Sequence, residues 1–258
     1  MASHAFADER RAHILQLLDQ ESSVQVAALA QALGVSAVTI RNDLDSLERD
    51  GKLRRTHGGA VALSRAVTVS IQDQRVNVNA QAKEAIGRGA AALVQDGQSV
   101  LVDSGTTALE FVRALAAKRD VTVVTPDVTV AELVDRSLPH LDAVLLGGSL
   151  RKGHRYVTGP VTLAALDLLH ADWAFVCPTS VVAGRGFMTN YAPMAEVKAQ
   201  MLLSASRRVV LADHGKMGAS GLVRFGGPGD ADMLLTDEGP GEEIAAYLAE
   251  GGCEVRKA

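Results

Sequence analysis

The stretch Ser99–Thr107 of this 258-residue chain carries residue types that suit the binding of an anion. An apolar run there ends in the sequence Asp103-Ser104-Gly105-Thr106-Thr107. Gly105 lets the backbone approach a ligand closely, and the two threonine hydroxyls can donate hydrogen bonds. A helix is expected to begin near Ala108, and a helix N-terminus favours negative charge. We predict a site for a phosphate or carboxylate group, although a capped turn between a strand and a helix is an equally good interpretation of this stretch alone.

Three further stretches place glycines or charged side chains next to apolar runs. Gly147-Gly148 follows one run, Glu196 and Lys198 lie in a helical stretch, and Asp213 and Lys216 follow another run. Lysines are suitable partners for phosphate, although each lysine alone is more simply a solvated surface residue. The chain has no GxxxxGK[ST] pattern, so a nucleoside-triphosphate site is not expected. The residues predicted to bind the anionic ligand are Asp103, Ser104, Gly105, Thr106, Thr107, Gly148, Glu196, Lys198, Asp213 and Lys216.

A second group of residues, in the stretch Ser36–Ala60, suits contact with a nucleic-acid duplex. Ile40, Leu44 and Leu47 recur at helical spacing, so one face of a helix capped by Ser36 is expected to be buried. The opposite face is polar, and the basic hairpin Lys52-Leu53-Arg54-Arg55-Thr56-His57 follows. This combination matches the groove and the phosphates of DNA. The predicted DNA-binding residues are Ser36, Val38, Thr39, Arg41, Asn42, Ser46, Arg54, Arg55 and His57.

The DNA-binding residues need three helices and a hairpin to position them. Helices are predicted at 8–20, 24–33 and 36–50, with Gly51 ending the third, and Gly58-Gly59 allows the hairpin to reverse. This order is that of a winged helix-turn-helix domain, in which Thr39, Asn42 and Ser46 face base edges and Arg41 clamps a phosphate. The alternative is a three-helix protein-interaction module with an incidental basic loop. The polar residues 64–80 are predicted to form a linker.

The ligand-binding residues need a different framework. From residue 81 onward, short apolar runs alternate with helical stretches, which predicts an α/β domain with a mainly parallel sheet covered by helices on both faces. Ligands of such sheets bind beyond the carboxyl ends of the strands, where the predicted residues lie. Strands are predicted at 99–103, 121–125, 143–147, 173–177, 208–212, 232–236 and 253–256. Helices are predicted at 82–95, 107–117, 127–136, 160–170, 192–206 and 241–249.

The overall composition excludes several classes of protein. Hydrophobic content of 47% and charged content of 22% are ordinary for a globular protein, and the net charge of −4 argues against general attachment to nucleic acid. Cys177 and Cys253 lack the spacing of a disulfide framework or a zinc site, and the histidines are scattered. We therefore expect no metal and no cofactor. No apolar run is long enough to span a bilayer and no secretory signal is evident, so a cytoplasmic location is expected.

Residues at fixed spacing in both parts of the chain resemble the DeoR family of bacterial transcriptional regulators. In the N-terminal part the matching positions are Arg10, Ile14, Leu18, Ser36, Thr39-Ile40-Arg41-Asn42-Asp43-Leu44, Leu47, Gly51, Arg54 and His57-Gly58-Gly59-Ala60. In the later part they are Asp103–Thr107, Gly147-Gly148, Gly159, Glu196-Val197-Lys198, Leu211-Ala212-Asp213 and Lys216. The resemblance implies a winged helix-turn-helix domain at 1–63, a linker at 64–80 and, at 81–258, a sensor domain similar in fold to ribose-5-phosphate isomerase.

The family resemblance also implies a function and its partners. The chain is expected to be a repressor of a carbohydrate-related operon, with operator double-stranded DNA as one partner and a phosphorylated sugar or related metabolite as its effector. A single winged helix gives a small interface, so a dimer or higher homo-oligomer that reads half-sites about 34 Å apart is expected. One alternative is a non-sensing architectural DNA-binding protein.

The other alternative is a sugar-phosphate isomerase fused to a DNA-binding domain, with Asp103, Glu196 and Lys198 as acid–base groups. Active isomerases of this fold carry an acidic loop of the Asp-Gly-Ala-Asp-Glu type, which has no counterpart here, so we expect no enzyme activity. Four positions after strands depart from the family pattern and are expected to alter the part of the site that reads the rest of the ligand. They are Val124-Thr125-Pro126-Asp127, Phe175–Ser180, Met194 and His214-Gly215.

Overall fold

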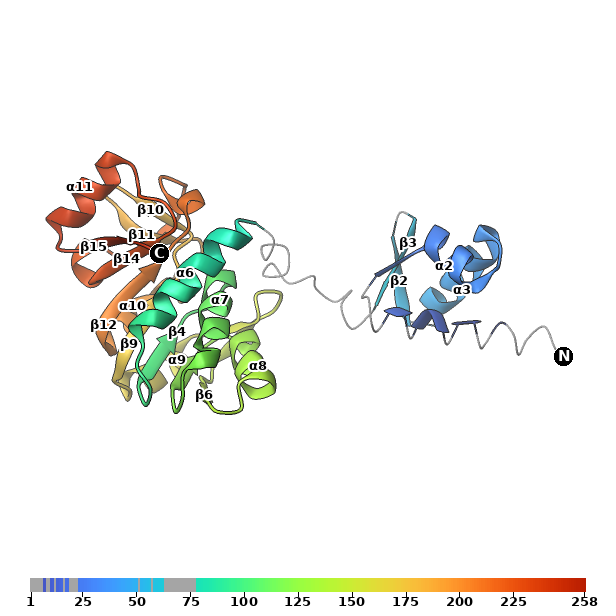
Figure 1. Cartoon of the computed structure of the whole chain (residues 1–258), viewed down its shortest axis with the longest axis horizontal. Helices are drawn as coiled ribbons and strands as arrows, with labels where there is room; N and C mark the ends of the chain where they lie inside the picture. Colours follow the sequence, from blue (N-terminus) through green and yellow to red (C-terminus); the bar gives the residue numbers. More distant parts are fainter. Residues whose placement is uncertain are drawn as a thin grey trace. The chain divides into compact units, whose positions relative to one another are not determined.

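The computed structural model of the chain describes residues 7, 10, 11, 13–15, 17, 18, 23–50, 52–56, 58–62 and 78–258. Contacts between residues divide the chain into two compact units, Met1–Val69 and Ser70–Ala258 (Figure 1). Most of the predicted linker, residues 64–77, lies outside the described residues, and so do parts of the predicted helix 8–20. The predicted domain boundaries therefore stay predictions.

The first unit is a winged helix-turn-helix. Its described residues between 10 and 18 are helical, and they precede α2 (Val26–Leu33) and α3 (Ala37–Arg49). Three antiparallel strands, β1 (Ser23–Gln25), β2 (Leu53–Thr56) and β3 (Gly59–Ala62), form a small sheet in the order β1-β3-β2. One apolar cluster joins these elements, and it contains Ile14, Leu18, Leu29, Ile40, Leu44, Leu47 and Leu53.

Strand β1 corrects the prediction that a helix begins at Val24. Residues 23–25 are extended and pair with β3, with Val24 opposite Ala60. Both of these side chains are buried, because a single apolar residue between polar neighbours packs well on a sheet face. Gly59 makes the pairing possible, since a Cβ atom there would lie 2.0 Å from the Val24 carbonyl oxygen.

Helix α3 forms as its residue types predict. The Ser36 hydroxyl oxygen accepts a hydrogen bond from the Thr39 backbone amide at 3.1 Å, which caps the first turn. Ile40, Leu44 and Leu47 are buried on one face. The helix ends at Arg49 with Asp50 as its C-cap, and Gly51, the predicted cap residue, lies outside the described residues.

The second unit contains a seven-stranded parallel sheet in the order β15-β14-β12-β9-β4-β5-β6. Every one of the seven predicted strands is present, so the predicted fold class is confirmed. The strands are β4 (Ser99–Val102), β5 (Thr122–Thr125), β6 (Asp142–Leu145), β9 (Ala171–Val176), β12 (Ala205–Leu211), β14 (Met233–Thr236) and β15 (Glu254–Lys257).

Helices cover both faces of this sheet (Figure 1). Helices α6 (Ala80–Leu93), α7 (Thr106–Ala114) and α8 (Val128–Ser137) share one apolar cluster, to which β4 contributes Val100 and Val102. Helices α9 (Pro160–Asp167), α10 (Ala192–Leu203) and α11 (Glu242–Glu250) share the other, to which β4 contributes Leu101. Alternate side chains of one strand thus enter the two layers of the core.

Several short elements were not predicted. Strands β7 (Ser149–Arg151) and β8 (Tyr156–Thr158) form a hairpin, and β10 (Ser180–Val182), β11 (Gly186–Thr189) and β13 (Val223–Gly226) form a separate three-stranded sheet. The end of the predicted helix 107–117 is a 3₁₀ turn, Leu115–Ala117, and the predicted helix 192–206 ends at Leu203. No helix among the described residues is long and apolar enough to cross a membrane.

Candidate functional site

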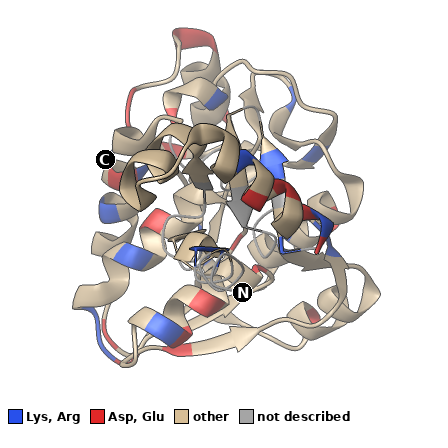
Figure 2. Cartoon of the chain, turned by 90° about the vertical axis from the view of Figure 1, so that its right-hand side faces the viewer, with Lys and Arg blue, Asp and Glu red and all other residues tan. Residues whose placement is uncertain are grey.

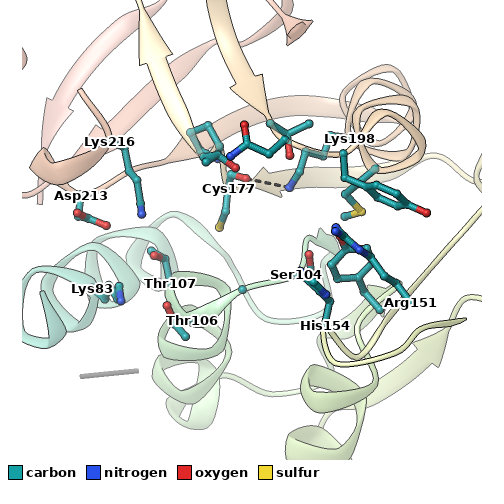
Figure 3. Close-up of a pocket in the computed structure, with 18 of the residues that line it drawn as sticks. Lys83, Ser104, Thr106, Thr107, Arg151, His154, Cys177, Lys198, Asp213 and Lys216 are labelled. Carbon is teal, nitrogen blue, oxygen red and sulfur yellow. Dashed lines mark hydrogen bonds between the residues drawn. The ribbon is translucent and has the colours of Figure 1, made fainter. Parts of the chain in front are cut away.

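A pocket of about 430 Å³ lies in the second unit, where the loops after β4, β9 and β12 meet the β7–β8 hairpin and the first turns of α6 and α10 (Figure 3). It has the size of a small-molecule site and the position expected for a ligand of a parallel sheet. Of the predicted ligand-binding residues, Ser104, Gly105, Thr106, Thr107, Lys198, Asp213 and Lys216 line this pocket.

The loop after β4 faces the pocket with backbone amides and hydroxyl groups. Gly105 adopts a φ of 127°, a conformation that side-chain-bearing residues rarely adopt, and it precedes the first turn of α7. Amides of a first helical turn have no partner within the helix, and no acidic residue lies in the first turn of α7. The loop therefore places Thr106 and Thr107 in the pocket lining, and their contact with an anion stays a prediction.

Asp103 and Lys198 form a buried ion pair at the base of the pocket. The Lys198 ammonium donates to the Asp103 carboxylate and, at 2.8 Å, to the Cys177 carbonyl oxygen. The Cys177 backbone amide donates to the same Asp103 carboxylate oxygen at 2.8 Å. These contacts join β4, β9 and α10. Asp103 does not line the pocket, so its position supports a structural role better than direct contact with ligand.

The thiol of Cys177 lines the pocket and is poorly suited to nucleophilic chemistry. Burial, followed by the nearby Asp103 carboxylate, raises its pKa to about 12. Because the thiolate is the reactive form, this cysteine stays a weakly polar wall of the pocket at neutral pH.

Two lysines and one carboxylate lie at one end of the pocket. Lys83 from α6 and Lys216 lie near Thr107, as Figure 3 shows. Asp213 accepts hydrogen bonds from the Asn79 amide at 2.7 Å and from the Gly215 backbone amide at 3.0 Å, so its carboxylate holds the loop after β12 against the start of α6. The two lysines therefore face the pocket beside a carboxylate that is already hydrogen-bonded.

The opposite end of the pocket carries Arg151 and His154 from the β7–β8 hairpin (Figure 3). The guanidinium carbon of Arg151 lies 3.9 Å from the ring centroid of Tyr191, and the guanidinium donates to the Tyr156 hydroxyl. Burial raises the pKa of Tyr156, although the Arg151 charge acts in the opposite direction, so the phenol keeps its proton at neutral pH.

Besides Asp103, two predicted ligand-binding residues do not line the pocket. Glu196 is exposed on α10 and does not line it. Gly148 has a φ of 145°, and a Cβ atom there would lie 2.1 Å from the Thr162 hydroxyl oxygen, so this glycine serves the packing of α9. Conversely, Lys83, Arg151, His154, Tyr156 and Tyr191 line the pocket and were not predicted. Arg151 lies three residues after the matched Gly147-Gly148 pair, and this was the signal available for it in the sequence.

Some of the residues that depart from the family pattern line the pocket, and others do not. Pro178 and Met194 line the pocket, and their contact with a ligand stays a prediction. Asp127 instead caps α8 through a 2.7 Å hydrogen bond from the Thr129 amide. His214 is exposed and binds the Asp237 carboxylate at 2.6 Å, which raises the pKa of the imidazole. His214 does not line the pocket, and its contact with Asp237 accounts for the position of its side chain.

The polar face of α3 presents several predicted DNA-binding residues to solvent. Ser36, Val38, Arg41 and Asn42 are exposed, and Thr39 and Ser46 are partly exposed. The Thr39 hydroxyl lies 2.9 Å from that of Ser36, so it supports the cap as well as facing outward. Acidic and basic residues are interspersed over the chain (Figure 2), so we expect contact with DNA to depend on this local face and not on the net charge.

The wing is attached to α3 by ionic contacts. The Arg55 guanidinium lies 3.1 Å from the Asp45 carboxylate, and the Arg55 backbone amide donates to Glu48 at 2.8 Å. Arg55 therefore orients the hairpin relative to the helix in addition to any contact with phosphate. The Arg54 side chain and His57 lie outside the described residues.

A contact that was not predicted from the sequence holds the other side of α3. Asp43 is buried, and Arg10 donates to its two carboxylate oxygens at 2.5 and 3.1 Å, with Arg11 at 3.3 Å. The hydrogen bond to this carboxylate raises the pKa of Arg10. The first helical segment thereby holds the exposed face of α3 in position.

A winged helix-turn-helix unit joined to an α/β unit with a ligand pocket defines a class, that of DNA-binding transcriptional regulators with a sensor domain. The family model described as the DeoR C terminal sensor domain matches residues 78–238, and the model described as the DeoR-like helix-turn-helix domain matches residues 10–66. The chain belongs to the DeoR family of transcriptional regulators.

Curated relatives extend over nearly the whole chain. The HTH-type transcriptional regulator GolR of Listeria innocua is 30% identical over 97% of this chain and 98% of its own length. The HTH-type transcriptional repressor GlcR of Bacillus subtilis is 29% identical over 97% of this chain and 96% of its own length. The transcriptional repressor AccR of Agrobacterium fabrum is 31% identical over 90% of both chains.

Among solved structures, ribose 5-phosphate isomerase A from Methanocaldococcus jannaschii is similar over 54% of this chain and 55% of its own, with 19% identity and a TM-score of 0.40. The eIF2B-beta2-delta2 complex from C. thermophilum is similar over 94% of this chain and 72% of that chain, with 14% identity and a TM-score of 0.46.

Proposed function

We propose that this regulator is a repressor of a carbohydrate-related operon, and that a phosphorylated small metabolite in the pocket of the sensor domain controls its binding to operator DNA. The observation that carries the proposal is the charge of the pocket. Lys83, Lys216 and Arg151 line it, whereas Asp213 is the one carboxylate among its described lining residues. Asp213 is already hydrogen-bonded to Asn79 and Gly215. A ligand with negative charge suits the positive charges of Lys216 and Arg151.

The phosphate group is proposed to lie against the loop after β4. The first-turn amides of α7 and the hydroxyl groups of Thr106 and Thr107 can donate to its oxygens, and Lys216 and Lys83 supply positive charge beside them. Pro178 and Met194 then contact the carbon skeleton of the ligand. Both residues depart from the family pattern, which supports a ligand that is specific to this regulator.

Helix α3 is proposed to enter the major groove of the operator. Arg41 and Asn42 are exposed, and asparagine can form a bidentate pair with adenine. A second copy of the chain is proposed to contact a second half-site about 34 Å away or a multiple of that distance. Ligand binding then changes DNA affinity by favouring one arrangement of the two DNA-binding units.

The protein is proposed not to be an isomerase. Of the three groups considered for acid–base chemistry, Asp103 and Lys198 neutralise each other in a buried pair, and Glu196 is exposed outside the pocket. The relatives named above are transcriptional regulators or repressors, which supports the same conclusion.

A thermal-shift screen of sugar phosphates tests the ligand class. A compound at one hundred times its Kd is expected to stabilise the protein by about 2.7 kcal/mol. Lys216→Ala should lose most of this stabilisation, whereas Lys152→Ala, which removes an exposed lysine outside the pocket lining, should keep it. Stabilisation by unphosphorylated sugars alone, or equal stabilisation of both variants, contradicts the proposal.

A further inference from the structure

The pocket has a positively charged group at each end, and the two ends differ in chemistry. At one end, Lys83 and Lys216 lie near Thr107, beside the hydrogen-bonded carboxylate of Asp213 (Figure 3). At the other end, Arg151 projects from the β7–β8 hairpin with His154. A single phosphate group placed against the loop after β4 uses the first end, so the second end needs its own explanation.

Arg151 is the arginine among the described residues that line the pocket, and it is held differently from five other arginines of the sensor domain. Carboxylate partners are present for Arg113, Arg136, Arg155, Arg208 and Arg256. For Arg151 the described residues provide an aromatic face, that of Tyr191, and the hydroxyl oxygen of Tyr156. Stacking and one hydrogen bond fix the plane of the guanidinium without neutralising it. The remaining N–H groups form a fork that matches a carboxylate or a phosphate.

The hydrogen bond between Arg151 and Tyr156 also favours a ligand group that accepts hydrogen bonds. The Tyr156 oxygen accepts from the guanidinium, so its own O–H can donate to a ligand. The described carboxylate of the pocket lining, Asp213, lies with the lysines at the other end. A sugar hydroxyl is best bound where acceptors accompany donors, whereas a carboxylate or phosphate is best bound where donors and positive charge converge.

We propose that the effector carries two anionic groups on one short carbon skeleton: a phosphate ester at the Lys216 end and a second anion, either a carboxylate or a second phosphate, at Arg151. This inference rests on the proposed function and narrows its ligand class from phosphorylated metabolites to phosphorylated sugar acids and sugar bisphosphates. The fork of Arg151 is then the specificity-determining group, and the lysines provide binding that all phosphorylated ligands share.

Matched pairs of compounds that differ at one end test this proposal by calorimetry on the full-length protein. The pairs are glycerol 3-phosphate with 3-phosphoglycerate, ribulose 5-phosphate with ribulose 1,5-bisphosphate, and glucose 6-phosphate with 6-phosphogluconate. In at least one pair, the compound with two anionic groups is expected to bind tenfold or more tightly than its partner, a difference of about 1.4 kcal/mol. Whether the better ligand has a carboxylate or a second phosphate identifies the second anion.

Variants of two neighbouring arginines assign the preference to one residue. Arg151→Gln is expected to bring the affinity ratio of the preferred pair close to one, and Arg151→Lys, which keeps the charge but not the fork, to leave an intermediate ratio. Arg155→Gln is the matched control, because Arg155 follows in the same hairpin, pairs with Glu132 and does not line the pocket. It should keep the wild-type ratio. Melting temperatures without ligand show whether each variant is folded.

The possible results separate this inference from the proposed function. If the monophosphates bind and no compound with two anionic groups binds better, the inference is wrong and the proposed function stands. An affinity ratio that Arg151→Gln leaves unchanged also contradicts the inference. If none of the six compounds binds but another monophosphate stabilises the protein in the thermal-shift screen, the inference is wrong and the proposed function stands.

Discussion

The base of the ligand pocket depends on a pair of charged side chains that the protein removes from water. Asp103 directly follows β4 and Lys198 lies on α10, and both are buried. Removal of one partner of such a pair leaves the other charge buried and uncompensated, which typically costs about 3–5 kcal/mol. The pair therefore fixes the positions of the loop after β4 and of the Cys177 backbone, which it also contacts.

Lys198→Met is predicted to lower the free energy of unfolding of the sensor domain by about 3–5 kcal/mol because it leaves the Asp103 carboxylate unpaired. The double variant Asp103→Asn/Lys198→Met should be less destabilised than the single variant. Urea unfolding can be followed by fluorescence of Trp173, the one tryptophan of the chain, which lies buried on β9. A double variant at least as unstable as Lys198→Met would show that the charge pair is not the reason.

Cys177 is predicted to react slowly with iodoacetamide near neutral pH. Its pKa of about 12, raised first by burial and then by Asp103, lowers the thiolate fraction there by about a thousandfold relative to an ordinary cysteine. The rate, measured by mass spectrometry of the Cys177 peptide in the folded protein, should continue to rise up to about pH 11. A rate that levels off below pH 9 would mean that the thiol is an activated one.

At the scale of elements, Arg55 joins the wing to α3, and we expect the two to form one DNA-binding surface. Arg55→Ala is predicted to weaken operator binding and to reduce the slope of log Kd against log salt by about one, because we expect this guanidinium to contact one phosphate. Asp45→Ala should strengthen binding, since it removes the carboxylate that pairs with Arg55. Fluorescence anisotropy on an operator selected from random DNA gives both values. An unchanged salt slope for Arg55→Ala limits its role to orienting the hairpin.

Helices α6 and α7 approach so closely at Gly87 that no side chain fits there. A Cβ atom at this position would lie 2.6 Å from the Glu110 carbonyl carbon and 2.8 Å from the Phe111 nitrogen. Gly87→Ala is therefore predicted to destabilise the sensor domain by about 1–3 kcal/mol in the Trp173 unfolding experiment. Gly89→Ala on the same helix is the control. Its Cβ atom would mainly meet the terminal residue Ala258 and should change stability by less than about 1 kcal/mol.

The long elements could be predicted from the chain because each has a strong local pattern. Runs such as Ser99–Val102 alternate between the two core layers, and α3 repeats its apolar residues at helical spacing. The short strands lacked such a pattern. Strand β11 acquires its structure from β13, where Phe187 pairs with Gly226, and β1 from β3. These pairings between distant residues are not visible in a window of neighbouring residues.

The site could be predicted in part for the same reason. The loop Ser104–Thr107 is a local motif at the end of a strand, and it lines the pocket. Lys198 has the residue type of a phosphate partner, but the distant Asp103 engages it. The position of Arg151 in the pocket depends on Tyr191, forty residues later in the chain. Such roles follow from tertiary packing, which residue types alone do not reveal.

At the scale of the whole molecule, the two units carry different parts of one proposed function. The winged helix-turn-helix supplies the DNA-binding face, and the α/β unit supplies the ligand pocket. A ligand can change operator affinity only if it binds one arrangement of the molecule more tightly than another. Couplings of this kind are typically about 1–3 kcal/mol, which corresponds to a change of about 5–150-fold in affinity.

The affinity of the full-length protein for an in vitro selected operator, measured with and without the phosphorylated compound that stabilises it most, tests the central claim directly. The predicted result is a change in Kd of at least about fivefold for the wild type and for Lys152→Ala, and loss of this response in Lys216→Ala. A compound that binds in the thermal-shift assay but leaves the operator Kd of the wild type unchanged would contradict the account.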